Sequence, residues 1–98
     1  MTVWNNCKTE IIYYNEDPAE TLIDTHQVRI DGSEILVSYE DDQGIVEYRG
    51  KENGDGHFEL TAPDRDGRAS LHRFPDGTTL EGFWLENGRR GMWRIMLR

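Results

Sequence analysis

The chain has few of the features that mark a disulfide scaffold, a membrane segment or a nucleic-acid partner. Cys7 is the single cysteine, which excludes an intrachain disulfide and predicts a small buried thiol. No run is apolar and long enough for a signal peptide or a membrane span, so we expect a soluble, cytoplasmic protein. Basic residues are scarce, with 11 Lys and Arg against 19 Asp and Glu and a net charge of −8. Such a surface repels phosphates, which argues against nucleic acid and anionic membrane as partners.

What the sequence does contain is a train of short strand-like runs separated by turns that contain glycine. Turns this short join antiparallel neighbours. The pattern predicts one mainly β domain over residues 1–98, an antiparallel meander of seven or eight strands forming a small barrel or half-barrel. The predicted strands are Lys8–Tyr14, Gln27–Asp31, Glu34–Glu40, Ile45–Arg49, His57–Ala62, Arg68–Phe74, Thr79–Glu86 and Met92–Arg98.

One short helix is expected between the first two strands. Asp17 can cap it, Pro18 suits the first helical position, and Glu20 stands three residues after the cap. The sequence therefore predicts a helix over about residues 18–23. A helix this short does not persist alone, so Leu22 and Ile23 would pack it onto the sheet.

The turns also predict which residues lie opposite one another on neighbouring strands. The register that follows keeps apolar side chains on one face, the core, and leaves a mixed polar and apolar face on the other side. The predicted pairs are Val28–Val37, Ile30–Ile35, Arg49–His57, His57–His72, Leu60–Ala69, Leu71–Gly82, His72–Glu81, Leu80–Ile95, Glu81–Arg94 and Phe83–Met92.

A row of ionisable side chains crosses the mixed face. His72 and Glu81 are its candidate catalytic pair, because a carboxylate beside an imidazole orients the ring and raises its basicity. The alternative is a surface ladder of ion pairs with little effect on stability. No metal-ligand spacing surrounds His57 or His72, and neighbouring arginines would repel a cation. We therefore expect neither a metal nor a cofactor.

An apolar group shares the mixed face near the last hairpin. If the N-terminal segment covers this group, it forms a second small core. If the group stays open, it is an interface, and self-association is the common outcome for a small domain. The candidate interface residues are Phe74, Phe83, Leu85, Met92 and Met96.

Three functional hypotheses follow. The first is a non-enzymatic binding or interaction protein that self-associates through the mixed face, with a homodimer as the simplest oligomer. The alternative is a small-molecule-binding β-barrel with an aromatic-lined pocket. Its ligand-binding candidates are Trp84, Trp93, Tyr39, Tyr48 and Arg94. The third is a small enzyme that uses His72 and Glu81.

One hairpin resembles a MORN repeat, a family with a Tyr-x-Gly-x-Trp hairpin and spaced glycines. The matching residues are Phe74-Pro75-Asp76-Gly77, Leu80-Glu81-Gly82-Phe83-Trp84, Gly88 and Gly91. Leu80 replaces the family's aromatic, the glycine after Trp84 comes one residue late, and no clear second repeat follows, so the family is not assigned. In general shape the meander is also similar to a calycin, an analogy of fold that says little about function.

Overall fold

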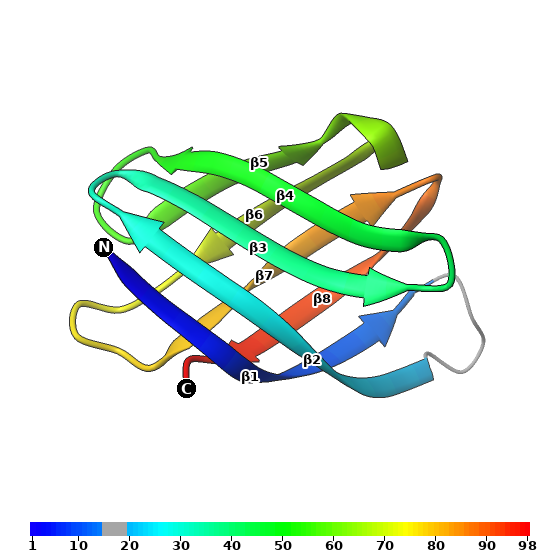
Figure 1. Ribbon diagram of the computed structural model, residues 1–98, viewed down its shortest axis with the longest axis horizontal. Coiled ribbons are helices and arrows are strands. Elements are labelled where there is room, and N and C mark those ends of the chain that lie inside the picture. The colour runs from blue at the N-terminus through cyan, green and yellow to red at the C-terminus, as the bar shows by residue number, and fades with distance from the viewer. Residues whose placement is uncertain (15–19) are drawn as a thin grey trace.

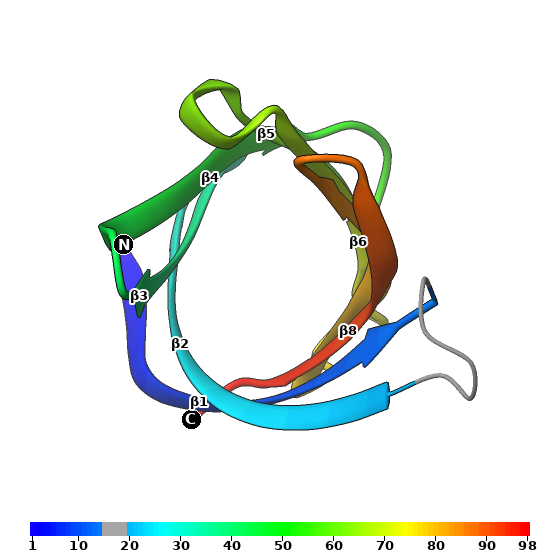
Figure 2. The same ribbon diagram turned by 90° about the vertical axis from the view of Figure 1, so that its right-hand side faces the viewer.

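The computed structural model describes residues 1–14 and 20–98, and these ranges form a closed antiparallel barrel (Figure 1). Each strand pairs with the next along the chain, and β8 returns to β1 to close the ring, as Figure 2 shows. The predicted meander is confirmed, and it is a full barrel rather than a half-barrel. The strands are β1 (Thr2–Tyr13), β2 (Glu20–Asp31), β3 (Glu34–Asp41), β4 (Gly44–Glu52), β5 (His57–Ala62), β6 (Gly67–His72), β7 (Thr79–Glu86) and β8 (Arg89–Met96).

The helix predicted over about residues 18–23 is wrong for its described part. Residues 18 and 19 lie outside the described residues, and the chain from Glu20 onward is strand β2. Leu22 and Ile23 pair with β1 and are 44% and 66% exposed instead of packing onto a sheet. The ladder to β1 satisfies backbone groups that an isolated helical turn would leave open, and this outweighs the capping signal. Within the described ranges the helical structure is one 3-10 turn, η1 (Pro63–Arg65).

The predicted cross-strand pairs occur in the barrel with one exception. Arg49 lies opposite Thr61, not His57, because β4 continues to Glu52 and makes the next turn shorter than expected. The continuation passes through Gly50, where an added Cβ would collide with the backbone oxygen of Glu59. Glycine therefore allows β4 and β5 to approach closely at a point where the sequence pattern suggests a loop.

The apolar face predicted as the core fills the barrel interior. Val28, Val37, Leu71, Leu80 and Ile95 have no exposed surface. The core also contains residues that the sequence pattern did not place there, which are Thr9, Ile11, His26 and Ala62.

Cys7 is fully buried, as predicted, and burial raises the pKa of its thiol. Within the described ranges no helix is long and apolar enough to cross a membrane. The cytoplasmic location expected from the sequence remains a prediction.

Candidate functional site

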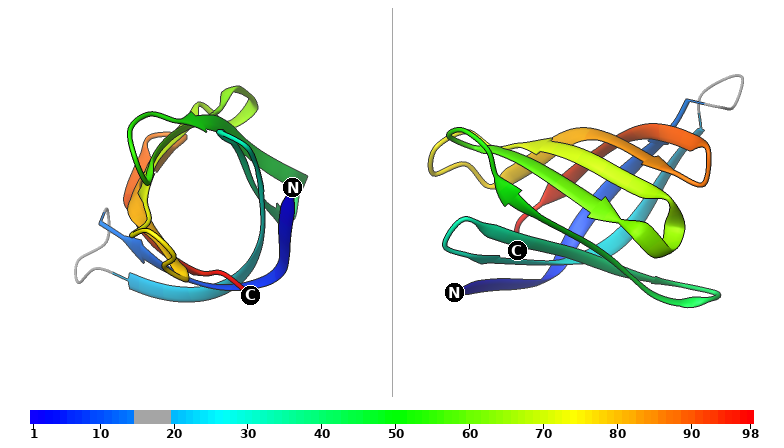
Figure 3. Two further views of the ribbon diagram at one scale, coloured as in Figure 1. Left: turned by 90° about the vertical axis from the view of Figure 1, so that its left-hand side faces the viewer. Right: turned by 90° about the horizontal axis from the view of Figure 1, so that it is seen from above.

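A pocket of about 300 Å³ lies at one end of the barrel. This end, called the pocket end, carries the β3–β4, β5–β6 and β7–β8 connections and faces the viewer in Figure 2. The opposite end, called the far end, carries the β2–β3, β4–β5 and β6–β7 connections. The left panel of Figure 3 faces the far end, and both termini lie toward it.

The pocket exists because the side chains that point into the barrel change from aliphatic to aromatic or polar along the strands. In a strand every second side chain points inward. Three strands change from aliphatic at the far end to aromatic or polar at the pocket end. These positions run Ile30, Val28, His26, Asp24 in β2; Ile35, Val37, Tyr39, Asp41 in β3; and Leu80, Gly82, Trp84, Glu86 in β7. The apolar half is packed, whereas the polar half forms the walls of the pocket.

Two tryptophans form one aromatic wall, and glycines opposite them make the space. Trp84 pairs with Gly91 and Trp93 pairs with Gly82 across the β7–β8 hairpin. A Cβ on Gly91 would collide with the backbone oxygen of Ile12 and lie 3.1 Å from the Trp84 ring. The two indoles stack at 21° with their centroids 6.2 Å apart. Each large ring thus lies over a position that has no side chain, which fixes the wall.

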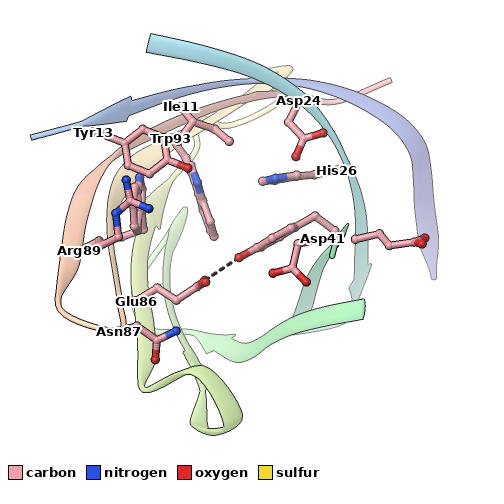
Figure 4. Close-up of a pocket in the computed structure, with 12 residues that line it drawn as sticks. Ile11, Tyr13, Asp24, His26, Asp41, Glu86, Asn87, Arg89 and Trp93 are labelled. Carbon is pink, nitrogen blue, oxygen red and sulfur yellow. Dashed lines mark hydrogen bonds between the residues drawn. The ribbon is translucent and has the colours of Figure 1, made fainter. Parts of the chain in front are cut away.

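Glu86 carries an inward-facing carboxylate held by two tyrosines. The hydroxyls of Tyr39 and Tyr48 both donate to Oε1 of Glu86 at 2.6 Å. Figure 4 shows the carboxylate of Glu86 turned into the pocket, with a dashed line marking a hydrogen bond to it. Burial and the nearby carboxylate raise the pKa of both phenols well above their usual range, so they stay protonated donors.

Arg65, from the η1 turn, braces the same end of the barrel. Its guanidinium donates two hydrogen bonds to Asp41, at 2.6 and 3.0 Å, and its Nη1 lies 4.0 Å from Oε2 of Glu86. The carbonyl of Arg65 also accepts a hydrogen bond from the backbone N–H of Asn87. The hydrogen bonds from Arg65 are the main reason why the pKa of Asp41 falls below its usual range. Arg65 therefore neutralises Asp41 and ties three connections together.

His26 is the unusual group in this pocket. Its ring is 1% exposed, stacks on Tyr39 at 4.9 Å and meets the edge of Trp93 at 5.3 Å. Burial lowers the pKa of His26 to about 4, although the charge of Asp24 opposes the shift. The imidazole is therefore neutral at pH 7, with one nitrogen a donor and the other an acceptor. Among the described residues neither nitrogen has a hydrogen-bond partner, and the same is true of Nε1 of Trp84.

The predicted ligand-binding residues divide between the two sides of the barrel wall. Trp84, Trp93 and Tyr39 line the pocket, and Tyr48 is fully buried with its hydroxyl on Glu86. Arg94 lies on the outer surface, with its side chain 54% exposed.

Sequence reasoning missed His26, Asp24 and Glu86. The signal was present, because these residues continue the inward alternation of the apolar positions. A polar residue at the end of such a series is readily assigned to a turn.

The predicted catalytic residues His72 and Glu81 both lie on the outer face, but they do not hydrogen-bond to each other in the described structure. His72 belongs to a network with His57 and Glu59, whereas Glu81 lies beside Arg94. Glu81 is opposite His72 in the register, but Nε2 of His72 lies 2.6 Å from Nδ1 of His57. The series of hydrogen bonds continues from Nε2 of His57 to Oε1 of Glu59 at 2.6 Å. The hydroxyl of Ser70 donates to the other oxygen of Glu59 at 2.7 Å. Within residues 1–14 and 20–98 no cluster of three His, Cys, Asp or Glu residues could hold a metal ion. A catalytic role for His72 and Glu81 stays a prediction.

The predicted interface residues also lie on the outer face. Phe74 and Met96 are at the far end, whereas Leu85 is beside the β7–β8 turn at the pocket end. Phe74 is 87% exposed and Phe83 is 37% exposed. With Met92 they line a surface hollow of about 880 Å³, called the outer hollow. Leu85 and Met96 are half-buried on the same face. The N-terminal strand does not lie over this face, because β1 pairs edge to edge with β2 and β8 as part of the barrel wall.

Comparison of the chain with protein-family models, with curated proteins and with solved structures found no match.

Proposed function

We propose that this protein binds a small molecule in the pocket end of its barrel. The observation that carries the proposal is His26, a fully enclosed neutral imidazole on the pocket wall with no hydrogen-bond partner among the described residues. An unsatisfied buried polar group costs about 1–3 kcal/mol, so such groups in a cavity favour a partner that enters it. Trp84 adds a second unsatisfied donor to the same wall.

The walls suit a flat ligand with a few polar atoms. Tyr13, Tyr39, Trp84 and Trp93 supply aromatic surface, whereas Glu86 and His26 supply fixed polar atoms. This combination of apolar walls and a few placed polar groups is typical of small-molecule sites. Taking about 30 Å³ per water molecule, 300 Å³ corresponds to a ligand of about ten non-hydrogen atoms.

Thermal unfolding against a panel of small aromatic compounds tests the proposal. A ligand at one hundred times its Kd adds about 2.7 kcal/mol of stability, which is a measurable rise in Tm. His26→Phe keeps an aromatic ring against Tyr39 but removes both nitrogens, so it should abolish the shift. His72→Phe, at an exposed histidine outside the barrel, is the matched control and should keep it. A compound that stabilises wild type and His26→Phe equally would place binding elsewhere.

A second function, self-association through the outer face, is supported by the outer hollow. Phe74 is 87% exposed, and Phe83 and Met92 extend the apolar surface around it. Light scattering should give a dimer for the wild type and a monomer for Phe83→Asp. Because Phe83 points outward, the variant should keep the wild-type circular dichroism spectrum. A wild-type protein that is monomeric at high concentration would refute this second proposal.

A further inference from the structure

Among the described residues that line the pocket, carboxylates outnumber cations, and the carboxylates differ in how completely they are paired. Asp41 is neutralised by its two hydrogen bonds from Arg65. Glu86 has both tyrosine hydrogen bonds on Oε1, and among the described residues the guanidinium of Arg65, 4.0 Å away, is the partner of Oε2. Asp24 also lines the pocket, and one of its oxygens accepts the backbone N–H of Thr25. In Figure 4, Asp24 and Glu86 lie on opposite walls of the pocket, with the ring of His26 between them in this view.

Arg89, the cationic side chain among the described residues that line the pocket, is already engaged with an aromatic ring. The guanidinium of Arg89 lies 4.7 Å from the ring centroid of Tyr13, at the side of the pocket away from Asp24 in Figure 4. A cation over an aromatic face is stabilised by the ring quadrupole, most strongly when water is excluded. The other aromatic walls, Tyr39, Trp84 and Trp93, offer the same kind of surface deeper in the barrel.

We propose that the ligand is a small organic cation, an ammonium group carried on an aromatic body, with Glu86 and Asp24 as its counter-charges. This inference rests on the proposed binding function and specifies its ligand class. Both carboxylates would attract the ammonium group, and the aromatic body would lie against Trp84 and Trp93. The far end of the ligand would carry a hydroxyl group, which can donate to or accept from whichever ring nitrogen of His26 it meets.

The charge of the whole molecule supports this ligand class. A net charge of −8 attracts cations and repels anions before they reach the barrel. An anionic ligand would in addition face Asp24 and Glu86 within a pocket that partly excludes water, where like charges repel strongly. A neutral aromatic compound could fill the volume but would bring no positive charge to Asp24 and Glu86.

Three compounds of nearly equal size separate charge from shape. They are tyramine, which carries an ammonium group, 4-ethylphenol, which is neutral, and 3-(4-hydroxyphenyl)propionate, which carries a carboxylate. Isothermal titration calorimetry at low and at physiological ionic strength should give tyramine at least a tenfold lower Kd than either analogue. A tenfold difference corresponds to about 1.4 kcal/mol.

Two variants assign the effect to the carboxylates. Glu86→Gln and Asp24→Asn should each weaken tyramine binding by about tenfold and leave 4-ethylphenol unchanged. Asp24 is exposed, so Asp24→Asn remains informative if Glu86→Gln fails to fold. Glu81→Gln removes a carboxylate on the outer face and is the matched control, which should bind tyramine as the wild type does.

The outcomes separate the ligand class from the binding function. If 4-ethylphenol or the carboxylate binds as tightly as tyramine, the cation inference is overturned and the binding proposal stands. If none of the three binds but another compound shifts the Tm through His26, the inference is again overturned alone. If no compound binds in either experiment, the cation inference and the binding proposal are both refuted.

Discussion

The buried imidazole of His26 should make the barrel sensitive to mild acid. An unfolded chain has an ordinary histidine with a pKa near 6.5, whereas burial lowers the pKa of His26 in the folded barrel to about 4. Between these values the unfolded chain binds a proton that the folded chain excludes. The contribution of His26 to stability is therefore complete above pH 6.5, declines as the pH falls, and is lost below pH 4.

The size of the effect follows from the shift. One pKa unit is worth about 1.4 kcal/mol, so a shift from 6.5 to about 4 is worth about 3 kcal/mol in total. Between pH 7 and pH 5 the expected loss is about 2 kcal/mol, which is large against a typical stability of about 5–15 kcal/mol. The charge of Asp24 opposes the effect of burial on the pKa of His26, and the value of about 4 already includes this attraction.

Urea unfolding followed by tryptophan fluorescence measures this loss directly. The free energy of unfolding is determined at several pH values for wild type, His26→Phe and His72→Gln. The His26 variant should have a pH profile flatter by about 2 kcal/mol between pH 7 and pH 5. The carboxylates are common to all three proteins, so their titration cancels in the differences. The reasoning is wrong if His26→Phe follows the wild-type profile, or if His72→Gln, at an exposed ring, flattens it by the same amount.

Three further substitutions test the packing around the pocket by urea unfolding. Tyr48→Phe removes a 2.6 Å hydrogen bond to Glu86 and should lower stability by about 1.5–3 kcal/mol; an unchanged midpoint would contradict that bond. Gly91→Val places a side chain against the backbone oxygen of Ile12 and should lower stability by about 1–3 kcal/mol. An unchanged stability would mean that β1 and β8 are farther apart at this position than the structure shows. Leu71→Ala at a fully buried position should lower stability by about 2–5 kcal/mol, and a loss below 1 kcal/mol would argue against a packed far end.

The sequence was sufficient to predict the barrel wall because its turns are short and its strands alternate. Two-residue turns such as Asn87-Gly88 leave few choices of register, and a one-residue slip would turn Leu80 and Ile95 outward. Prediction failed where a local signal competed with long-range pairing. The capping pattern around Pro18 favours a helix, but pairing of β2 with β1 determines the conformation from Glu20 onward.

The candidate site could be predicted only in part, for a different reason. The aromatic residues Trp84, Trp93 and Tyr39 were found because they belong to the apolar series. His26 was missed because the predicted strand began one residue later, at Gln27, whereas β2 begins at Glu20. Glu86 was missed because a polar residue at a strand end is usually exposed. Only closure of the barrel decides that these two positions point into an enclosed space, and closure depends on the pairing of β1 with β8, the two ends of the chain.

The two proposed activities occupy opposite parts of the barrel and should be independent. The pocket lies inside the wall at the pocket end, whereas the outer hollow with Phe74 and Phe83 lies outside it toward the far end. Between them the interior is packed with fully buried side chains such as Leu71 and Leu80, which leave no continuous path for a ligand. A dimer formed through the outer hollow would leave the pocket open. Phe83→Asp should therefore change the oligomeric state without changing the Kd of the ligand, and His26→Phe should do the reverse. A change in Kd on dimer dissociation would mean that the partner copy contributes to the site, and the two proposals would then describe one function.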